Sequence, residues 1–320
     1  MNQPDTPNST VRFLTVGENQ DGQRLDNFLI TALKGAPRTL VYRIVRTGEV
    51  RVNKGRARPD TRVHDGDIVR VPPLRLAEEN PAPVAGARLT RSLRERVIYH
   101  QDGLIVLNKP AGLAVHGGSG VPFGVIEAMR SVFPEKDFLE LVHRLDRDTS
   151  GLLMVAEKRS VLRELHEQLR QGRMRKTYVA LLAGNLKGGQ HTVTAPLHKG
   201  NLPNGERIVR VSRDGKEAKT VFKVIERFAN ATLVEASPLT GRTHQIRVHA
   251  QFLGHPILGD EKYGQDETNK AARAWGLNRL FLHARALTLT LPGKEKPLAL
   301  ECPLADDLQS VLEVLRHAPV

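Results

Sequence analysis

The chain begins with two segments in which apolar residues recur at helical spacing. The first contains Leu25, Phe28, Leu29 and Leu33, and the second contains Leu40, Ile44 and Val45. A Gly-Ala-Pro sequence at residues 35–37 separates the two segments. At residues 50–52 and 68–71 the period shortens to two, which is typical of strands. We therefore predict a compact helix, helix, strand module over residues 22–77, preceded by a lead-in over residues 1–21 whose polar start is a mobile tail.

The hydrophobic pattern changes after this module. Residues 78–92 are rich in Pro and Ala and have no clear period, which is typical of a linker between domains. From residue 93 to residue 320, short apolar runs predict strands at 104–107, 152–156, 178–182, 232–236 and 287–291. Helical stripes are fewer, at residues 162–169, 246–252 and 308–315. The predicted class is α+β, with a mixed, largely antiparallel sheet in a large second domain.

Composition is typical of a soluble globular protein: the 320 residues are 40% hydrophobic and 26% charged. No apolar run reaches the length of a bilayer span, and the polar start lacks a signal-peptide pattern, so we expect a cytoplasmic protein. The single cysteine, Cys302, excludes an internal disulfide and a Cys-rich zinc site, and we interpret it as a small buried residue.

Positive charge is concentrated near the start of the chain. The net charge is +13 and the pI is about 10.1. Residues 22–77 contain 12 Lys or Arg and 5 Asp or Glu, so a net +7 lies in under a fifth of the chain. Such a concentration indicates a polyanionic partner, and composition alone leaves RNA, DNA and an anionic membrane surface open.

The most informative segment for chemistry is LVHRLDRDTSGLLMVAEK at residues 141–158. Polar residues crowd a loop between two predicted strands, which is how sites are commonly built. Asp148 and the two hydroxyl residues after it are as well explained by a turn that caps backbone amides. Asp146 lies between Arg144 and Arg147. We expect its carboxylate to remain ionised when water is excluded, as a nucleophile or base requires.

Two other polar clusters accompany this loop. The segment LNKPAGLAVHGGSG (107–120) has glycines that could approach a phosphate, but it does not place Lys and Ser or Thr as a P-loop does, which argues against nucleotide binding. In residues 237–264, Thr240 and Gly241 are predicted to start a helix. Arg247 would then project back over the first turn, where its guanidinium could pair with Asp146 and bind phosphate.

Histidines and one tyrosine complete the candidates. His244, His249 and His255 occur without the HExxH helix or a nearby carboxylate triad, so we expect no metal site. His143, His244 and His283 are interpreted as structural hydrogen-bonding residues. Tyr178, at the start of a predicted strand, is either a half-buried edge aromatic or a ring that stacks on a base.

These motifs resemble the RluA family of pseudouridine synthases over essentially the whole chain. The matching segments are NKPAG (108–112), HRLDRDTSGLL (143–153), RKTYVAL (175–181), GRTHQIRVH (241–249), HPILGDEKYG (255–264) and LHA (282–284). The N-terminal module is similar to the S4 RNA-binding domain. GGSG (117–120) and ERIVRVS (206–212) are most similar to the subgroup that modifies several uridines in 23S ribosomal RNA.

The resemblance implies roles for individual residues. Asp146 would be the catalytic aspartate, Arg144 would help to evert the target uridine, and Tyr178 would pack on the flipped base. Arg247 would pair with the aspartate and Arg242 would assist. Basic residues of the S4-like module would bind ribosomal RNA: Arg38, Arg43, Arg46, Arg51, Lys54, Arg56 and Arg58. Isomerisation involves no redox change, so no cofactor or metal is expected, and a monomer is the default.

Two alternative functions stay open, and different experiments test them. A metal-dependent RNA-processing hydrolase, suggested by the histidines and by Asp146 with Asp148, would shorten RNA and lose activity in EDTA. A non-catalytic ribosome-assembly factor would bind RNA through the basic module and would have no need of the Asp146 loop. The sequence leaves open which uridines are modified, and whether Asp146 attacks the sugar or the ring or removes the C2′ proton.

Overall fold

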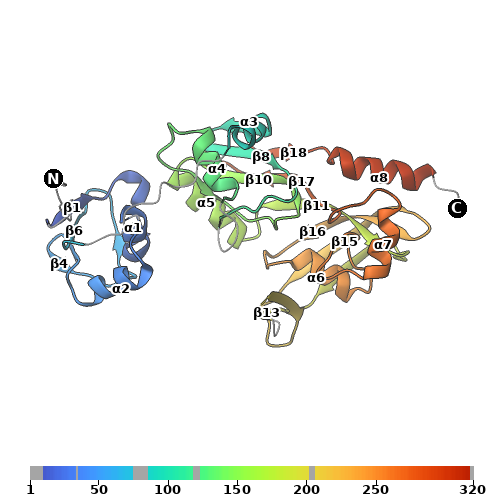
Figure 1. The fold of residues 1–320 in the computed structure, drawn as a ribbon, viewed down its shortest axis with the longest axis horizontal. Helices are drawn as coiled ribbons and strands as arrows, with labels where there is room; N and C mark the ends of the chain where they lie inside the picture. The colour runs from blue at the N-terminus through green and yellow to red at the C-terminus, as the bar shows by residue number, and fades with distance from the viewer. Residues whose placement is uncertain (1–9, 34, 75–85, 118–122, 202–205, 318–320) are drawn as a thin grey trace, which may run out of the picture. The chain divides into compact units, whose positions relative to one another are not determined.

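The chain divides into an N-terminal unit, Met1–Val84, and a C-terminal unit, Ala85–Val320 (Figure 1). The computed structural model describes residues 10–33, 35–74, 86–117, 123–201 and 206–317. Each unit has a hydrophobic core built from its own residues.

The N-terminal unit packs two helices against short strands. Its elements are β1 (Arg12–Thr15), η1 (Glu18–Gln20), β2 (Gln23–Arg24), α1 (Leu25–Ala32), α2 (Arg38–Arg46), β3 (Arg51–Val52), β4 (Gly55–Arg56), β5 (Arg62–Val63) and β6 (Ile68–Val71). One sheet has the order β1-β6-β3-β4, and β2 pairs with β5. Both predicted helices are confirmed, and their apolar stripes face the core at Leu25, Leu29 and Ile44.

The structure differs from the expected boundaries at two places. β1 pairs antiparallel with β6, so this unit begins before residue 22. Residues 87–92 of the expected linker belong to α3 (Ala87–Glu95), because Leu89 and Leu93 lie four apart and pack into the core of the C-terminal unit. Residues 1–9 of the expected tail and 78–85 of the expected linker lie outside the described residues.

The C-terminal unit is built on a ten-stranded sheet. Its strands are β7 (Val97–Gln101), β8 (Leu104–Lys109), β9 (Glu140–Leu141), β10 (Ser150–Ala156), β11 (Arg175–Ala183), β12 (Gln190–Thr194), β15 (Lys219–Arg227), β16 (Ala231–Pro238), β17 (Leu282–Leu289) and β18 (Leu298–Glu301). The main order is β12-β15-β16-β11-β17-β10-β8-β7, and β13 (Leu197–Asn201) and β14 (Arg207–Val211) form a separate hairpin. Among the described strands only β10 and β17 pair in parallel, which confirms the mixed, largely antiparallel sheet.

Helices cover this sheet and explain its continuous apolar runs. The helices are α3, α4 (Val125–Val132), α5 (Arg159–Arg170), α6 (Gln245–Phe252), α7 (Asp266–Arg273) and α8 (Asp306–His317). Alternate residues of β8 and β10 enter two different hydrophobic clusters: Leu153 belongs to the cluster that includes residues of α3, α4 and α8, and Leu152 to the cluster that includes residues of α5. Because both faces of these strands are buried, the strands carry no polar alternation. Cys302 is buried, as expected.

The sheet register brings distant segments together at one end. Gly151 of β10 is opposite Ala284 of β17, and Ala284 is opposite Tyr178 of β11. Gly151 has φ 107°, and a Cβ there would lie 2.3 Å from the carbonyl oxygen of Ala284, so only glycine allows this close strand pairing. The loop before β10, which contains Asp146, is thereby held near the start of β11. None of the helices in the described part of the chain is long and apolar enough to cross a bilayer.

Candidate active site

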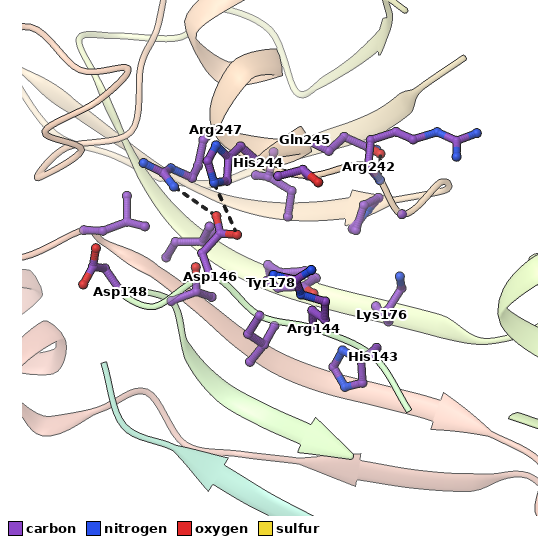
Figure 2. A pocket seen from close by; sticks show the side chains of 18 of the residues that line it. His143, Arg144, Asp146, Asp148, Lys176, Tyr178, Arg242, His244, Gln245 and Arg247 are labelled. Carbon is purple, nitrogen blue, oxygen red and sulfur yellow. Dashed lines mark hydrogen bonds and ion pairs between the residues drawn. The ribbon is translucent and has the colours of Figure 1, made fainter. Parts of the chain in front are cut away.

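A cleft of about 2070 Å³ opens in the C-terminal unit (Figure 2). It is lined by residues 143–149 before β10, the first residues of β11, the segment from β16 into α6, and residues 259–262. All five candidates that the sequence placed outside the basic module line it: Arg144, Asp146, Tyr178, Arg242 and Arg247. The basic candidates of residues 38–58 belong to the N-terminal unit.

Asp146 is held by an arginine from a different element. Arg247, on α6, donates from Nη1 to Oδ2 of Asp146 at 3.0 Å. The same guanidinium donates from Nε and Nη2 to the two carboxylate oxygens of Asp260, at 2.7 and 2.8 Å. The exposed side-chain fraction rises along this chain of charges, from 0% for Asp260 to 11% for Arg247 and 25% for Asp146. Asp146 is therefore the member of the three that is most open to the cleft.

The electrostatics favour a fixed guanidinium cation. Burial by itself lowers the pKa of Arg247, but the hydrogen bonds and charges of Asp260 and Asp146 raise that pKa above its usual range. Burial likewise opposes ionisation of Asp260, and Arg247 more than offsets it, so the pKa of Asp260 is lowered. Backbone N–H groups of Lys262 and Tyr263 also donate to Asp260. A bidentate pair on one side leaves Arg247 little freedom in how it presents Nη1 to Asp146.

His244 approaches Asp146 beside Arg247 (Figure 2). Its Nε2 lies 3.8 Å from Oδ1 of Asp146, and its Nδ1 lies 2.7 Å from the hydroxyl of Tyr263. The backbone of His244 is left-handed, with φ 52°, an uncommon conformation for a residue with a Cβ. Burial lowers the pKa of His244, while the charge of Asp146 opposes this shift. The residue was interpreted as a structural hydrogen-bonding side chain, and the structure adds its position against the carboxylate.

The arginines next to Asp146 in sequence do not hold it, contrary to our expectation. The guanidinium of Arg147 turns to Asp148, with Nε 3.1 Å from Oδ1. Arg144 is exposed and lines the cleft, and within the described residues it forms no ion pair with Asp146. Consecutive loop side chains point in different directions, and the charge beside Asp146 comes from Arg247, the pairing that the sequence also predicted.

The helix that carries Arg247 starts later than predicted. α6 begins at Gln245, five residues after Thr240, and the preceding residues form a polar turn. Gln245 Oε1 accepts from the backbone N–H of Arg242 at 3.0 Å and lies 2.6 Å from Thr240 Oγ1. These side-chain bonds compete with helical ones, which is why the helix is delayed. Arg242 donates from Nε to the carbonyl of Glu217 at the rim.

Tyr178 and Lys176 line the cleft from β11. Tyr178 is buried, and burial together with the negative charge of Asp146 raises the pKa of its phenol. The hydroxyl is therefore neutral. Burial lowers the pKa of Lys176. In Figure 2, Tyr178 and Arg144 lie on the other side of Asp146 from Arg247.

Lys109 fixes the Asp146 loop from below the cleft. Its side chain is fully buried, and its Nζ donates to the carbonyl oxygens of Pro110, Leu113 and Arg147 at 2.8, 2.8 and 2.9 Å. Burial lowers its pKa to about 7. The contact with Arg147 ties strand β8 to the residue directly after Asp146. Of the glycine loop beside Lys109, residues 118–120 lie outside the described residues.

The remaining histidines make structural contacts. His143 Nε2 accepts the N–H of Met154 at 3.2 Å, and His283 Nδ1 lies 2.9 Å from the hydroxyl of Ser150. Both interpretations as hydrogen-bonding residues are confirmed. Within the part of the chain that the structure describes, no group of three His, Cys, Asp or Glu is placed to hold a metal ion.

Comparison with known proteins identifies the family to which the chain is similar. Residues 103–252 match the family described as RNA pseudouridylate synthase, and residues 23–69 match the S4 domain. A relative from Haemophilus influenzae, named ribosomal large subunit pseudouridine synthase C, is 52% identical over 97% of this chain and 97% of its own length. The chain belongs to the RNA pseudouridylate synthase family. A relative of the same name from Escherichia coli strain K12 is 52% identical over 98% of this chain and 99% of its own length.

Solved pseudouridine synthase structures agree with the fold. Human RNA pseudouridylate synthase domain containing 4 is 29% identical, with a TM-score of 0.60 over 72% of this chain and 96% of that chain. Human RNA pseudouridylate synthase domain containing 1 is 25% identical, with a TM-score of 0.54 over 70% of this chain and 95% of that chain. The expected fold, an S4 domain with a pseudouridine synthase domain, is confirmed, and the protein is an isomerase.

Sequence reasoning missed two residues of this synthase cleft. Asp260, which anchors Arg247, lies in a motif that the resemblance included without a role for this residue. Its signal is a carboxylate between Gly259 and further polar residues, directly after an apolar stretch. The second is the position of His244, a residue that the sequence offered only as a structural hydrogen-bonding side chain; its place against Asp146 depends on a left-handed backbone that no spacing rule indicates.

Proposed function

We propose that this synthase converts specific uridines to pseudouridine in 23S ribosomal RNA in the cytoplasm, with Asp146 as its catalytic carboxylate and without a metal or cofactor. The relatives named ribosomal large subunit pseudouridine synthase C support the choice of RNA, because they match nearly the whole chain at 50–52% identity. An S4 domain supports RNA as the partner of the N-terminal unit.

The observation that carries the catalytic role is the charge chain Asp260, Arg247, Asp146. A buried bidentate pair holds one N–H of Arg247 at 3.0 Å from Asp146, and the other oxygen of Asp146 faces the cleft beside His244. A neighbouring cation stabilises the ionised form of a carboxylate where water is scarce. The site therefore presents an oriented carboxylate, next to a fixed cation, to a substrate in the cleft.

This group suits the chemistry of the reaction. Uridine and pseudouridine are isomers: the bond from N1 to C1′ breaks, the uracil rotates, and C5 bonds to C1′ with loss of the C5 proton and gain of one at N1. The atoms balance without an oxidant or reductant, which supports a reaction that needs no redox cofactor. Whether the carboxylate adds to the sugar or ring, or takes the C2′ proton, it acts in its ionised form.

The target base must leave its stack before Asp146 can act on it. Unstacking costs on the order of a few kcal/mol, and aromatic and phosphate contacts offset the cost. Tyr178 supplies a neutral ring in the cleft wall next to Asp146. Arg144 supplies an exposed cation at the same wall, suited to hold the strand from which the base leaves. Arg242, at the rim, would contact a neighbouring phosphate.

The N-terminal unit would bind the RNA outside the cleft. Its proposed contacts lie on α2, on β3, in the turn from β3 to β4, on β4 and just after β4, and all are exposed except the half-buried Arg51: Arg38, Arg43, Arg46, Arg51, Lys54, Arg56 and Arg58. Arg43 and Arg46 lie three apart on α2 and reach the same side of the helix. Phosphate contacts of this kind position the RNA without specifying its sequence.

Replacement of the carboxylate tests the proposal. Asp146→Asn keeps the shape of the side chain and its contact distance to Arg247 but removes the charge. We expect turnover on 23S ribosomal RNA, mapped by mass spectrometry, to fall at least about 10³-fold, while RNA binding persists. The matched control is Asp148→Asn, which removes a carboxylate two residues away that pairs with Arg147 at the rim. Full turnover by Asp146→Asn would overturn the assignment.

A further inference from the structure

The outer face of the sheet in the N-terminal unit carries one aromatic and three arginines in a single line. The strand register pairs Phe13 with Arg70, Arg70 with Arg51, and Arg51 with Arg56. Residues directly opposite each other on neighbouring strands share a face of the sheet. The four side chains therefore cross β1, β6, β3 and β4 in one row, roughly 14 Å long at about 4.8 Å per strand step. We call these four residues the arginine row.

The two faces of this sheet differ sharply. Val69 and Val71, which alternate with Arg70 on β6, are fully buried in the unit's core. On the opposite face Phe13 is 67% exposed, and Ile68 beside it is 49% exposed. Exposed apolar side chains that adjoin one another are typical of an interaction surface. The row thus has an apolar end and a cationic end.

The cationic end lacks neutralising carboxylates. Across the described residues, none of the three arginines forms an ion pair. Arg70 donates to the backbone carbonyl of Glu49 at 2.8 Å and Arg56 to that of Arg46 at 3.3 Å, contacts that orient the guanidinium groups without cancelling their charge. Like charges directly opposite each other on adjacent strands destabilise a sheet. An anionic ligand would remove this repulsion.

Nearby acidic side chains are engaged elsewhere. The carboxylate of Glu49 accepts the hydroxyl of Thr47 at 2.7 Å. The carboxylate of Asp67 accepts from the side chain of Asn53 and from the backbone of His64, both at 2.7 Å. Neither carboxylate forms an ion pair with an arginine of the row among the described residues, so the three guanidinium groups are available to an anionic ligand.

We propose that the arginine row binds single-stranded RNA, with one base stacked on Phe13 and the following phosphates against Arg70, Arg51 and Arg56. This inference rests on the proposed function, in which RNA is the substrate, and it adds a sheet surface to the basic side of α2. An aromatic side chain followed by a line of cations suits an unpaired RNA strand. In such a strand the face of a base is free to stack on the ring, and the phosphates that follow the base can contact the cations. A duplex hides its base faces and offers nothing to Phe13.

Binding of a labelled oligouridylate of about 12 nucleotides to the full chain tests the proposal. We expect Phe13→Leu to weaken binding about tenfold, because Leu keeps the apolar contact but cannot stack, and Phe13→Tyr to bind as the natural chain does. The matched control is Phe252→Leu, because Phe252 is 60% exposed at the end of α6 in the other unit. It should leave oligouridylate affinity unchanged.

The charges are tested by the salt dependence of the same binding. The triple variant Arg51→Gln, Arg56→Gln and Arg70→Gln should reduce the slope of log affinity against log salt concentration by about 2, since each phosphate contact to a single strand contributes about 0.7. A charge-matched control takes three exposed arginines from the other unit: Arg88→Gln, Arg163→Gln and Arg273→Gln. Circular dichroism reports whether each variant folds, and the Phe13 series decides the matter if the triple variant does not.

Each outcome separates this surface from the catalytic proposal. Unchanged oligouridylate binding by Phe13→Leu would overturn the inference. So would an equal loss of affinity for a duplex of the same length, because a purely phosphate-binding patch would not distinguish the two. Turnover retained by Asp146→Asn would instead contradict the proposed chemistry. That substitution should leave oligouridylate binding at the arginine row unchanged.

Discussion

Arginine has opposite surroundings in the two units. Arg247 in the cleft is 11% exposed, and two carboxylates share its guanidinium. Arg51, in the middle of the arginine row, has an arginine on each side and no ion pair among the described residues. The first arrangement fixes a donor before substrate arrives, and the second leaves charge for a partner that comes and goes. Under our proposals the same side chain therefore serves preorganisation in one unit and reversible phosphate binding in the other.

Removal of the buried arginine should have the largest effect. Arg247→Met leaves Asp260 buried without a cation, and breaking a buried pair in this way costs about 3–5 kcal/mol of the free energy of unfolding. Turnover should fall on the order of 10²-fold as well, because Asp146 loses its fixed donor. Urea denaturation and single-turnover kinetics measure the two effects.

An exposed ion pair of the same unit provides the control for this variant. Arg316 pairs with Glu226, and both side chains are partly exposed, at 41% and 33%. Arg316→Met should change the free energy of unfolding by less than about 1 kcal/mol and leave turnover intact. Equal losses of the free energy of unfolding in the two variants would mean that the buried Arg247 pair contributes no more to stability than an exposed ion pair.

Separation of the units should have the next largest effect. Deletion of residues 1–84 removes a unit with its own core and leaves the cleft residues, all of which lie beyond residue 113. We expect affinity for full-length 23S ribosomal RNA to fall about 10- to 100-fold and to depend less on salt. Turnover on a short RNA hairpin that contains the target uridine should stay within about threefold. Full affinity in the truncated protein would place the phosphate contacts in the C-terminal unit, and the contrast drawn between the two units would be wrong.

Much of the fold could be predicted, because the burial of a helix or strand is recorded in the spacing of its own apolar residues. The stripes of α1 and α2 and the double-sided apolar runs of β8 and β10 record burial directly in the sequence. The start of α6 was mispredicted, since Gln245 and its neighbours exchange helical bonds for side-chain bonds that depend on the folded turn. α3 was missed because a short helix with two apolar residues is hard to distinguish from a linker.

The contacts within the two charged regions could not be predicted in the same way. Asp146 and Arg247 are 101 positions apart, and the motifs around each identified them without giving the third member, Asp260. Phe13 and Arg70 become neighbours only through the register of β1 with β6, and a shift of one residue would turn Arg70 into the core. Sequence patterns therefore identified the chemistry of single residues, and the register decided which of them act together.

A histidine in the cleft of the C-terminal unit predicts how the stability of this unit responds to acid. His143, beside the Asp146 loop, accepts the N–H of Met154, and burial lowers its pKa to about 3. In the unfolded chain the pKa is about 6.5, so between pH 6.5 and pH 3 the unfolded state binds a proton that the folded state does not. The free energy of unfolding must then fall as the pH falls through this window.

A variant that does not titrate isolates this contribution. In His143→Gln the side-chain amide oxygen can accept the same N–H, so urea denaturation at pH 7.5 and at pH 5 should differ less than in the natural chain. The expected difference between the two proteins is about 1–2 kcal/mol, from 1.36 kcal/mol per pH unit. Other buried histidines such as His283 titrate in both proteins and cancel. Parallel profiles would contradict the prediction, because they would mean that His143 has nearly the same pKa in the folded and unfolded chains.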